Sequence, residues 1–322
     1  MNIALAPQEN LPFEQVSPPL ELVHGIEPFF QTRMGLALHA DSLEVLKKIP
    51  DNSVNLVFTS PPYALHFKKE YGNANQADYV VWFMQFAKEI KRILTEDGSF
   101  VLNIGGTWQA GQPTRSIYHF KLVVALVEEL CLNLAQETFW YNPAKMPVPA
   151  QWVTVKRVRV KDAVEYVWWF SKSANPKADN RKVLRPYSKD MLRLAKKGVK
   201  TTVRPSGHNI TESWDKLHNG GSIPPNMIDD DTPSDLLKMG NNSANDGYTK
   251  KCKELGIKIH PARFPAQLPE FYIKLLTNEG DIVLDPFAGS MTTGQVSEQL
   301  NRRWIGVDNV EEYLDGAKLR FV

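Results

Sequence analysis

The chain has 322 residues, of which 43% are hydrophobic and 23% charged, so it can bury a large core in one elaborated domain or two close ones. Its two cysteines exclude a disulfide framework and fit a reducing cytoplasm, and the chain has no charge-free apolar run of membrane-spanning length, so we expect no membrane association. A net charge of +2 does not by itself indicate a nucleic-acid partner.

Strands and helices are predicted to alternate along the first half of the chain. Residues 1–33 are proline-rich and irregular, which indicates an arm or a poorly ordered cap. A strand is predicted at 34–38, a short helix at 42–49, and a longer helix at 79–94, where apolar side chains recur at helical spacing. Further strands are predicted at 100–104, 137–141 and 164–170, with a helix at 122–132.

The C-terminal part continues this pattern. An apolar strand ends at Asp285, a glycine-bearing turn and a helical stretch follow, and a second strand at 304–307 ends in Asp308 before a helix at 311–319. The alternation predicts an α/β fold with a doubly wound, mostly parallel, Rossmann-like sheet. The loops at the carboxyl ends of such strands usually carry the functional residues.

An apolar strand is followed directly by Ser60-Pro61-Pro62-Tyr63. These four residues suit methylation of an exocyclic amine on a nucleic-acid base. The lone pair of such an amine is delocalised into the ring, and two acceptors on its hydrogens would free it. Ser60 Oγ and the Pro61 carbonyl are candidates, because successive prolines hold the backbone rigid beforehand. Tyr63 supplies a ring face on which a base removed from the double helix can stack, a role that needs no hydroxyl.

The second candidate element is the turn Asp285-Pro286-Phe287-Ala288-Gly289-Ser290. It lacks the three-glycine fingerprint of dinucleotide sites, and Asp285 would repel a pyrophosphate at the following helix. S-adenosyl-L-methionine has a ribose and cationic groups but no phosphate, so an acidic turn suits it. Asp308, at the end of the next strand, is placed to hold ribose hydroxyls. No metal site is expected.

The two elements resemble those of the DNA amino-methyltransferases, in the permuted (beta-type) class where the catalytic motif precedes the cofactor motif. The resemblance covers most of residues 34–320, looks closest to the cytosine-N4 methyltransferases of type II restriction–modification systems, and includes the segments at 40–44, 204–208, 220–226 and 260–265. It implies a methyltransferase fold, S-adenosyl-L-methionine as cofactor, double-stranded DNA as substrate and a partner endonuclease with the same recognition sequence. Met291 departs from the family, which often has a second glycine there; we expect ordinary backbone angles at Met291 and a slightly narrower turn.

The resemblance also implies roles for individual residues and a division of the chain. Asp41 would accept from the adenine amino group of the cofactor, and Phe264 and Pro265 would pack near its methionine moiety, although core packing is nearly as good an explanation for Phe264. The expected parts are an arm at 1–33, a catalytic half at 34–171, a target-recognition region at 172–258 and a cofactor-binding half at 259–322. A monomer is expected, with a dimer as the alternative.

The expected recognition region begins with a basic run. Residues 172–204 hold eleven Lys or Arg against two acids, Asp179 and Asp190, which gives +9. Such a run is often only a solvated surface, but in this interval it suits the DNA phosphate backbone.

Other functions remain open at this stage. Methylation of adenine N6 is the nearest, because Ser60 favours cytosine only through the family resemblance. Methylation at cytosine carbon 5 needs an attacking thiolate, and neither Cys131 nor Cys252 follows a proline in a loop. A non-catalytic DNA-binding module and a protein or RNA methyltransferase are the remaining alternatives.

Overall fold

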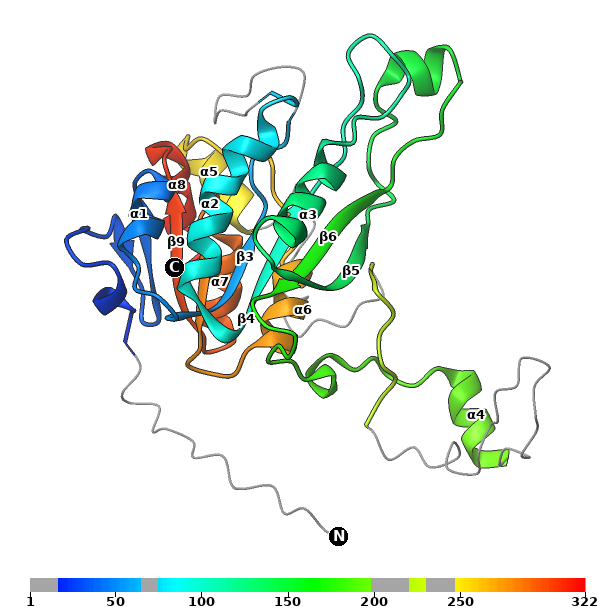
Figure 1. The fold of residues 1–322 in the computed structure, drawn as a ribbon. Helices are drawn as coiled ribbons and strands as arrows, with labels where there is room; N and C mark the ends of the chain where they lie inside the picture. Colours follow the sequence, from blue (N-terminus) through cyan, green and yellow to red (C-terminus); the bar gives the residue numbers. More distant parts are fainter. Residues whose placement is uncertain (1–16, 65–74, 198–219, 230–246, 322) are drawn as a thin grey trace.

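The computed structural model describes residues 17–64, 75–197, 220–229 and 247–321, which form a mixed α/β structure around one sheet (Figure 1). The sheet has nine strands in the order β1-β2-β9-β8-β3-β4-β6-β5-β7. Their bounds are Phe30–Gln31 (β1), Gly35–His39 (β2), Val54–Thr59 (β3), Leu94–Ile104 (β4), Asn133–Tyr141 (β5), Val164–Ser171 (β6), Met227–Ile228 (β7), Ile282–Asp285 (β8) and Arg303–Asp308 (β9). The predicted α/β class and mostly parallel sheet are confirmed.

Strand direction decides which residues reach the functional edge of the sheet. The central pairs β2·β9, β9·β8, β8·β3 and β3·β4 are all parallel, so these five strands end at one edge. Strand β6 lies antiparallel to both β4 and β5, and therefore begins where the central strands end. Because the chain moves outward in opposite directions from β8 and from β3, a crevice is expected at the carboxyl ends of these two strands.

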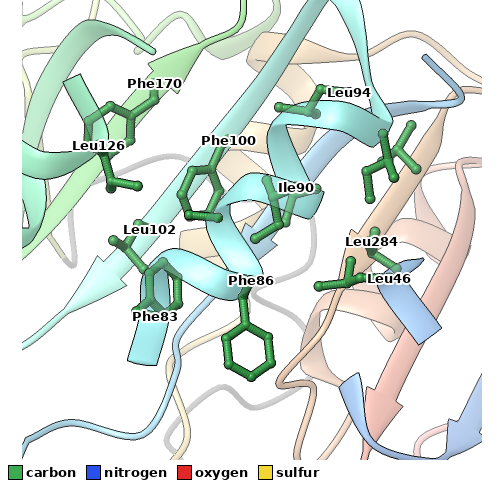
Figure 2. Packing of buried hydrophobic residues seen from close by; sticks show 14 of the residues in the cluster. Leu46, Phe83, Phe86, Ile90, Leu94, Phe100, Leu102, Leu126, Phe170 and Leu284 are labelled. Atoms are coloured by element: carbon green, nitrogen blue, oxygen red, sulfur yellow. The ribbon is translucent and has the colours of Figure 1, made fainter. Parts of the chain in front are cut away.

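Helices cover both faces of the sheet, and their bounds are Ser42–Lys48 (α1), Tyr79–Ile93 (α2), Tyr118–Glu128 (α3), Lys189–Lys197 (α4), Gly247–Leu255 (α5), Gln267–Leu276 (α6), Thr292–Gln299 (α7) and Glu311–Lys318 (α8). Helices α1, α2 and α3 pack on one face, where Phe83 and Ile90 of α2 meet Phe100 of β4 (Figure 2). On the other face, Tyr272 of α6 packs against Phe58 of β3. None of the helices in the described ranges has the length and hydropathy that a bilayer span requires.

Most expected elements exist, with shifted boundaries. Helix α3 begins at Tyr118 rather than 122, because Tyr118 and His119 are buried in an aromatic cluster, and β4 begins at Leu94 rather than 100. The expectation of an irregular segment before residue 34 is wrong at Phe30–Gln31, which pair with Ala37 and Leu36 of β2. The expected segment at 204–208 lies outside the described residues.

Met291 does not have the ordinary backbone angles expected from the sequence. Its φ is +57°, in the left-handed region that glycine favours, and its side chain is fully buried with Met34, Trp304 and Leu314. A Cβ on Gly306 would lie 2.2 Å from Met291 Sδ, so the methionine fills the space beside that glycine. The prediction was wrong because burial of the side chain outweighs a backbone penalty of about 1–2 kcal/mol.

Replacing Met291 with Gly should therefore lower the free energy of unfolding by about 1–3 kcal/mol, since the core loses more than the backbone gains. Urea denaturation measures this change. Cys131→Gly is the matched control, because Cys131 also has a left-handed φ (+52°) but an exposed side chain, so that variant should be unchanged or up to about 1 kcal/mol more stable. A stabilised Met291→Gly variant would contradict this account of the turn.

Candidate active site

A cavity of about 690 Å³ opens at the carboxyl ends of the central strands, within the size range of ligand pockets. Both candidate elements line it, although more than 220 residues separate them in the sequence. The expected site residues at its wall are Asp41, Ser60, Pro61, Pro62, Tyr63, Phe264, Pro286, Phe287, Gly289, Ser290 and Asp308. Pro265 and Asp285 lie outside this lining.

A buried hydrogen bond joins the two elements. Thr59, the residue before Ser60, donates from Oγ1 to Asp285 Oδ1 over 2.7 Å. Asp285 Oδ2 accepts from Thr293 Oγ1 at 2.7 Å, and Oδ1 also accepts from the Phe287 amide at 3.1 Å. Asp285 is thus satisfied inside the protein, and its carboxyl group holds the turn instead of facing the cavity.

The element Ser60–Tyr63 is held in place by contacts within the protein. Pro61 is buried, and the Pro62 carbonyl accepts a 2.9 Å hydrogen bond from Tyr79 Oη. The Tyr63 ring lies against Gly105, where an added Cβ would come within 2.5 Å of Cε2. This contact fixes the ring plane at the cavity wall.

Three polar residues that the sequence did not single out surround Ser60 and Tyr63. Asn103, at the end of β4, directs Nδ2 toward Ser60 Oγ at 3.4 Å and Tyr63 Oη at 3.5 Å. Glu165, at the start of β6, accepts from Tyr63 Oη at 2.8 Å and from Lys145 Nζ at 2.7 Å. The signal of Glu165 was hidden because an antiparallel β6 brings its first residues, not its last, to this edge.

The opposite end of the cavity is formed by the turn after β8 and the end of β9. Gly289 has a φ of +50°, and its amide donates to Asp308 Oδ2 at 2.8 Å, while Asp308 Oδ1 accepts from the Val310 amide at 2.9 Å. Each carboxylate oxygen keeps a further lone pair for a ligand. Burial raises the pKa of Asp308, and the two backbone donors oppose that effect.

The N-terminal part contributes a second acid to the cavity and a hydrogen bond that ties it to the turn after β8. Asp41 caps α1 by accepting from the Leu43 amide at 2.8 Å, and its exposed carboxylate lines the cavity. Ser42 Oγ donates to the Pro286 carbonyl, which ties α1 to the turn after β8. Among the residues that the structure describes, this half of the cavity therefore offers the carboxylates of Asp41 and Asp308 and backbone groups, which fit a ribose-bearing, cationic cofactor such as S-adenosyl-L-methionine.

Apolar groups complete the cavity. Phe264 lines it and also packs edge-on against Phe58 at a ring separation of 5.4 Å, so it serves the core and the cavity together. Trp82, Phe86 and Phe287 form an aromatic wall. The ring of His260 lies against Gly289, and burial lowers the pKa of His260 to about 4, so this histidine is neutral near pH 7.

Comparison with known proteins identifies the family. A family model described as DNA methylase matches residues 54–319. The chain belongs to this DNA methylase family. The type II methyltransferase M.PvuII of Proteus hauseri is 47% identical over 301 residues, which cover 92% of this chain and 87% of that protein. M.BamHI of Bacillus amyloliquefaciens is 27% identical over 293 residues, covering 89% and 57%. The solved structure titled PvuII DNA methyltransferase (cytosine-N4-specific) matches with a TM-score of 0.73 and 41% identity over 92% of this chain and 90% of that one.

In this DNA methylase, Asp285 should make stability depend on pH. Burial raises the pKa of Asp285 from its ordinary value of 3.8 to about 6, so the folded protein keeps a proton that the unfolded chain loses. The free energy of unfolding should therefore fall by about 3 kcal/mol in total as the pH rises between these two pKa values. Asp285→Asn removes this dependence. Urea unfolding measures the difference in free energy of unfolding between the wild type and this variant. The difference should favour the wild type more at pH 4.5 than at pH 7; an equal difference at both pH values would exclude the raised pKa.

Asp308→Ala should weaken the binding of S-adenosyl-L-methionine more than the binding of DNA. Hydrogen bonds between a carboxylate and the ribose hydroxyls contribute about 1.5–3 kcal/mol each, so the dissociation constant should rise at least tenfold. Calorimetric titration with the cofactor measures the change, and Asp315→Ala, an exposed acid of α8 paired with Lys318, is the control. Unchanged cofactor affinity in Asp308→Ala would make Asp308 a structural residue of the turn.

Proposed function

We propose that this DNA methyltransferase transfers a methyl group from S-adenosyl-L-methionine to the N4 amine of a cytosine flipped out of duplex DNA. The observation that carries the proposal is one cavity lined by Ser60 and Pro61 at one end and by Gly289 and Asp308 at the other. The 47% identity to M.PvuII, and the cytosine-N4-specific title of the solved PvuII enzyme, support cytosine as the base.

The chain's residues divide the reaction between binding and activation. Asp308, Gly289 and Asp41 bind the cofactor, together with the turn residues Pro286, Phe287 and Ser290 and with Phe264; Asp285 and Pro265 support them from outside the cavity. The bound cofactor supplies an electrophilic methyl group. At the other end, Ser60 Oγ and the Pro61 carbonyl accept from the two amine hydrogens, and the rigid Pro61-Pro62 backbone keeps that geometry ready before the base arrives.

Tyr63 binds the flipped base by its ring. The ring packs against Gly105 and lines the cavity, where the flipped cytosine would stack on it. A strong general base is not needed, because the methylated nitrogen is acidic and releases its extra proton readily. Water is kept from the reacting groups by the aromatic wall of Trp82, Phe86 and Phe287.

The duplex contacts come from two places. Much of the basic run at 172–204 is engaged within the protein, since Lys177 pairs with Asp281 at 2.6 Å and Arg185 with Asp229 at 2.9 Å. The segment between β5 and β6 also carries exposed Lys156, Arg157 and Lys161, and it extends beyond the carboxyl edge of the sheet (Figure 1). Of these, Lys161 Nζ donates to the Pro143 carbonyl at 2.7 Å and Lys156 Nζ lies over the Trp152 ring. A 2.7 Å hydrogen bond from the Asn142 amide to the Ala163 carbonyl closes its base beside the cavity. We therefore add this segment to the expected recognition region at 172–258 as a phosphate-binding surface.

The names of the relatives support a proposal for the biological setting. A type II methyltransferase acts beside an endonuclease with the same recognition sequence, and the proposal extends this pairing, with a monomeric enzyme in the cytoplasm, to this chain. The division at 34–171, 172–258 and 259–322 is part of the same proposal, with the first and last segments forming one catalytic domain.

Ser60→Ala tests the activating role. Loss of one preorganised hydrogen bond to the reacting group should lower kcat about a hundredfold while leaving cofactor and DNA affinities nearly unchanged. The methylated product is identified by digesting the DNA enzymatically and analysing the nucleosides by mass spectrometry. The wild type should yield N4-methylcytosine. N6-methyladenine would overturn the assignment of the base, and wild-type turnover in Ser60→Ala would overturn the mechanism.

A further inference from the structure

We propose that Lys145 and Glu165 are positioning residues that set the direction of the hydrogen bonds around Ser60, so that its oxygen lone pair, not its proton, faces the target amine. The inference rests on the proposed function, because it concerns the same reacting amine. A serine hydroxyl is both a donor and an acceptor. Ser60 accepts from the amine reliably only if its own proton has another acceptor to bind.

The structure supplies that acceptor as a chain of four side chains. Lys145 Nζ donates to Glu165 Oε1 at 2.7 Å, Tyr63 Oη donates to Glu165 Oε2 at 2.8 Å, and Ser60 Oγ lies 3.4 Å from Tyr63 Oη. The last distance is long, as hydrogen bonds in unliganded active sites often are. The chain ends at Ser60, which lines the cavity.

The direction of the chain follows from its charged end. An ionised Glu165 can only accept, so Tyr63 must spend its one proton on Glu165. Tyr63 Oη can then only accept from Ser60, which directs the serine proton to Tyr63 and leaves a lone pair of Ser60 Oγ for the amine. Burial, followed by the charge of Glu165, raises the pKa of Tyr63 well above its usual value, so Tyr63 keeps the proton that it donates.

The surroundings favour a fixed chain. The side chain of Glu165 is only 12% exposed and that of Lys145 27%, so the ion pair is screened less than a surface pair. Asn103 Nδ2 also donates toward Ser60 Oγ and Tyr63 Oη, and thereby adds donors on the same side without offering Ser60 another acceptor through that nitrogen. The hydroxyl of Tyr63 therefore has a role that the stacking argument did not require.

Glu165→Gln tests the proposal, because glutamine keeps the size of the side chain but can donate to Tyr63 and reverse the chain. The single-turnover rate constant at saturating cofactor and DNA should fall about tenfold, less than the roughly hundredfold expected for losing Ser60 itself. Tyr63→Phe cuts the chain and should give a similar loss. DNA affinity, and the fluorescence of pyrrolocytosine at the target position, should stay at wild-type values, since binding and flipping precede the step that is affected.

The decisive measurement is the rate of the double variants. In Ser60→Ala and in Tyr63→Phe backgrounds, Glu165→Gln should lower the single-turnover rate constant by less than about twofold, because the hydrogen-bond chain no longer reaches a serine oxygen. Multiplying effects would overturn the proposal, as would a full wild-type rate in Glu165→Gln. Glu89→Gln is the control, since Glu89 pairs with Arg92 at 2.7 Å with 25% of its side chain exposed and does not line the cavity; its rate should be unchanged.

Failure of the proposed function gives a different result. If the wild type methylates adenine instead of cytosine, the product analysis shows it, while the ratios between variants still test the chain on the amine that is methylated. Lys145→Met should lower the single-turnover rate constant less than Glu165→Gln does, because it leaves the carboxylate but removes its partner. If Lys145→Met lowers the rate constant by the same factor in the Ser60→Ala background, Lys145 would be assigned to DNA binding, which contradicts its positioning role.

Discussion

The active site depends on the parallel pairing of β3 with β8. Leu56 and Val57 pair with Val283 and Leu284, and the hydrogen bond from Thr59 to Asp285 continues this contact at the last residue of each strand, between residues 226 apart in the sequence. Every residue proposed to act on the base follows β3, lies on β4 or β6, or precedes β6, whereas the turn proposed for the cofactor follows β8. The separation of the two elements is therefore set by the spacing of two neighbouring strands, which a sheet fixes at about 4.8 Å.

Much of the site could be predicted from sequence because its signals are local. Ser60-Pro61-Pro62-Tyr63 and the turn from Asp285 to Ser290 each follow an apolar strand, and parallel strands bring their carboxyl ends to one edge. The family prediction made from these residues is confirmed by the DNA methylase match over residues 54–319. The α/β class was predictable for the same reason, because alternating periodicity is a property of short windows.

The remaining features depend on contacts that no short window contains. Glu165 was missed because nothing in residues 164–170 reveals that the strand runs antiparallel to β4. The angles of Met291 were mispredicted because the space beside Gly306 belongs to a different strand, and β1 was missed because a two-residue edge strand has no periodicity. The structure also shows that part of the basic run serves the fold, since Lys172, Lys177 and Arg185 form ion pairs with Glu96, Asp281 and Asp229.

The strand order also constrains how the protein is made. Strands β2 and β3 are synthesised early but are not neighbours; the places between them are filled by β9 and β8. At about 5–20 residues per second, the 226 residues that separate Thr59 from Asp285 take roughly 10–45 s to translate. Throughout that time β3 has one edge without its final partner, and such edges pair readily with other chains. High contact order of this kind slows folding and favours aggregation, so production of the enzyme should respond strongly to temperature and to chaperones that hold nascent strands apart.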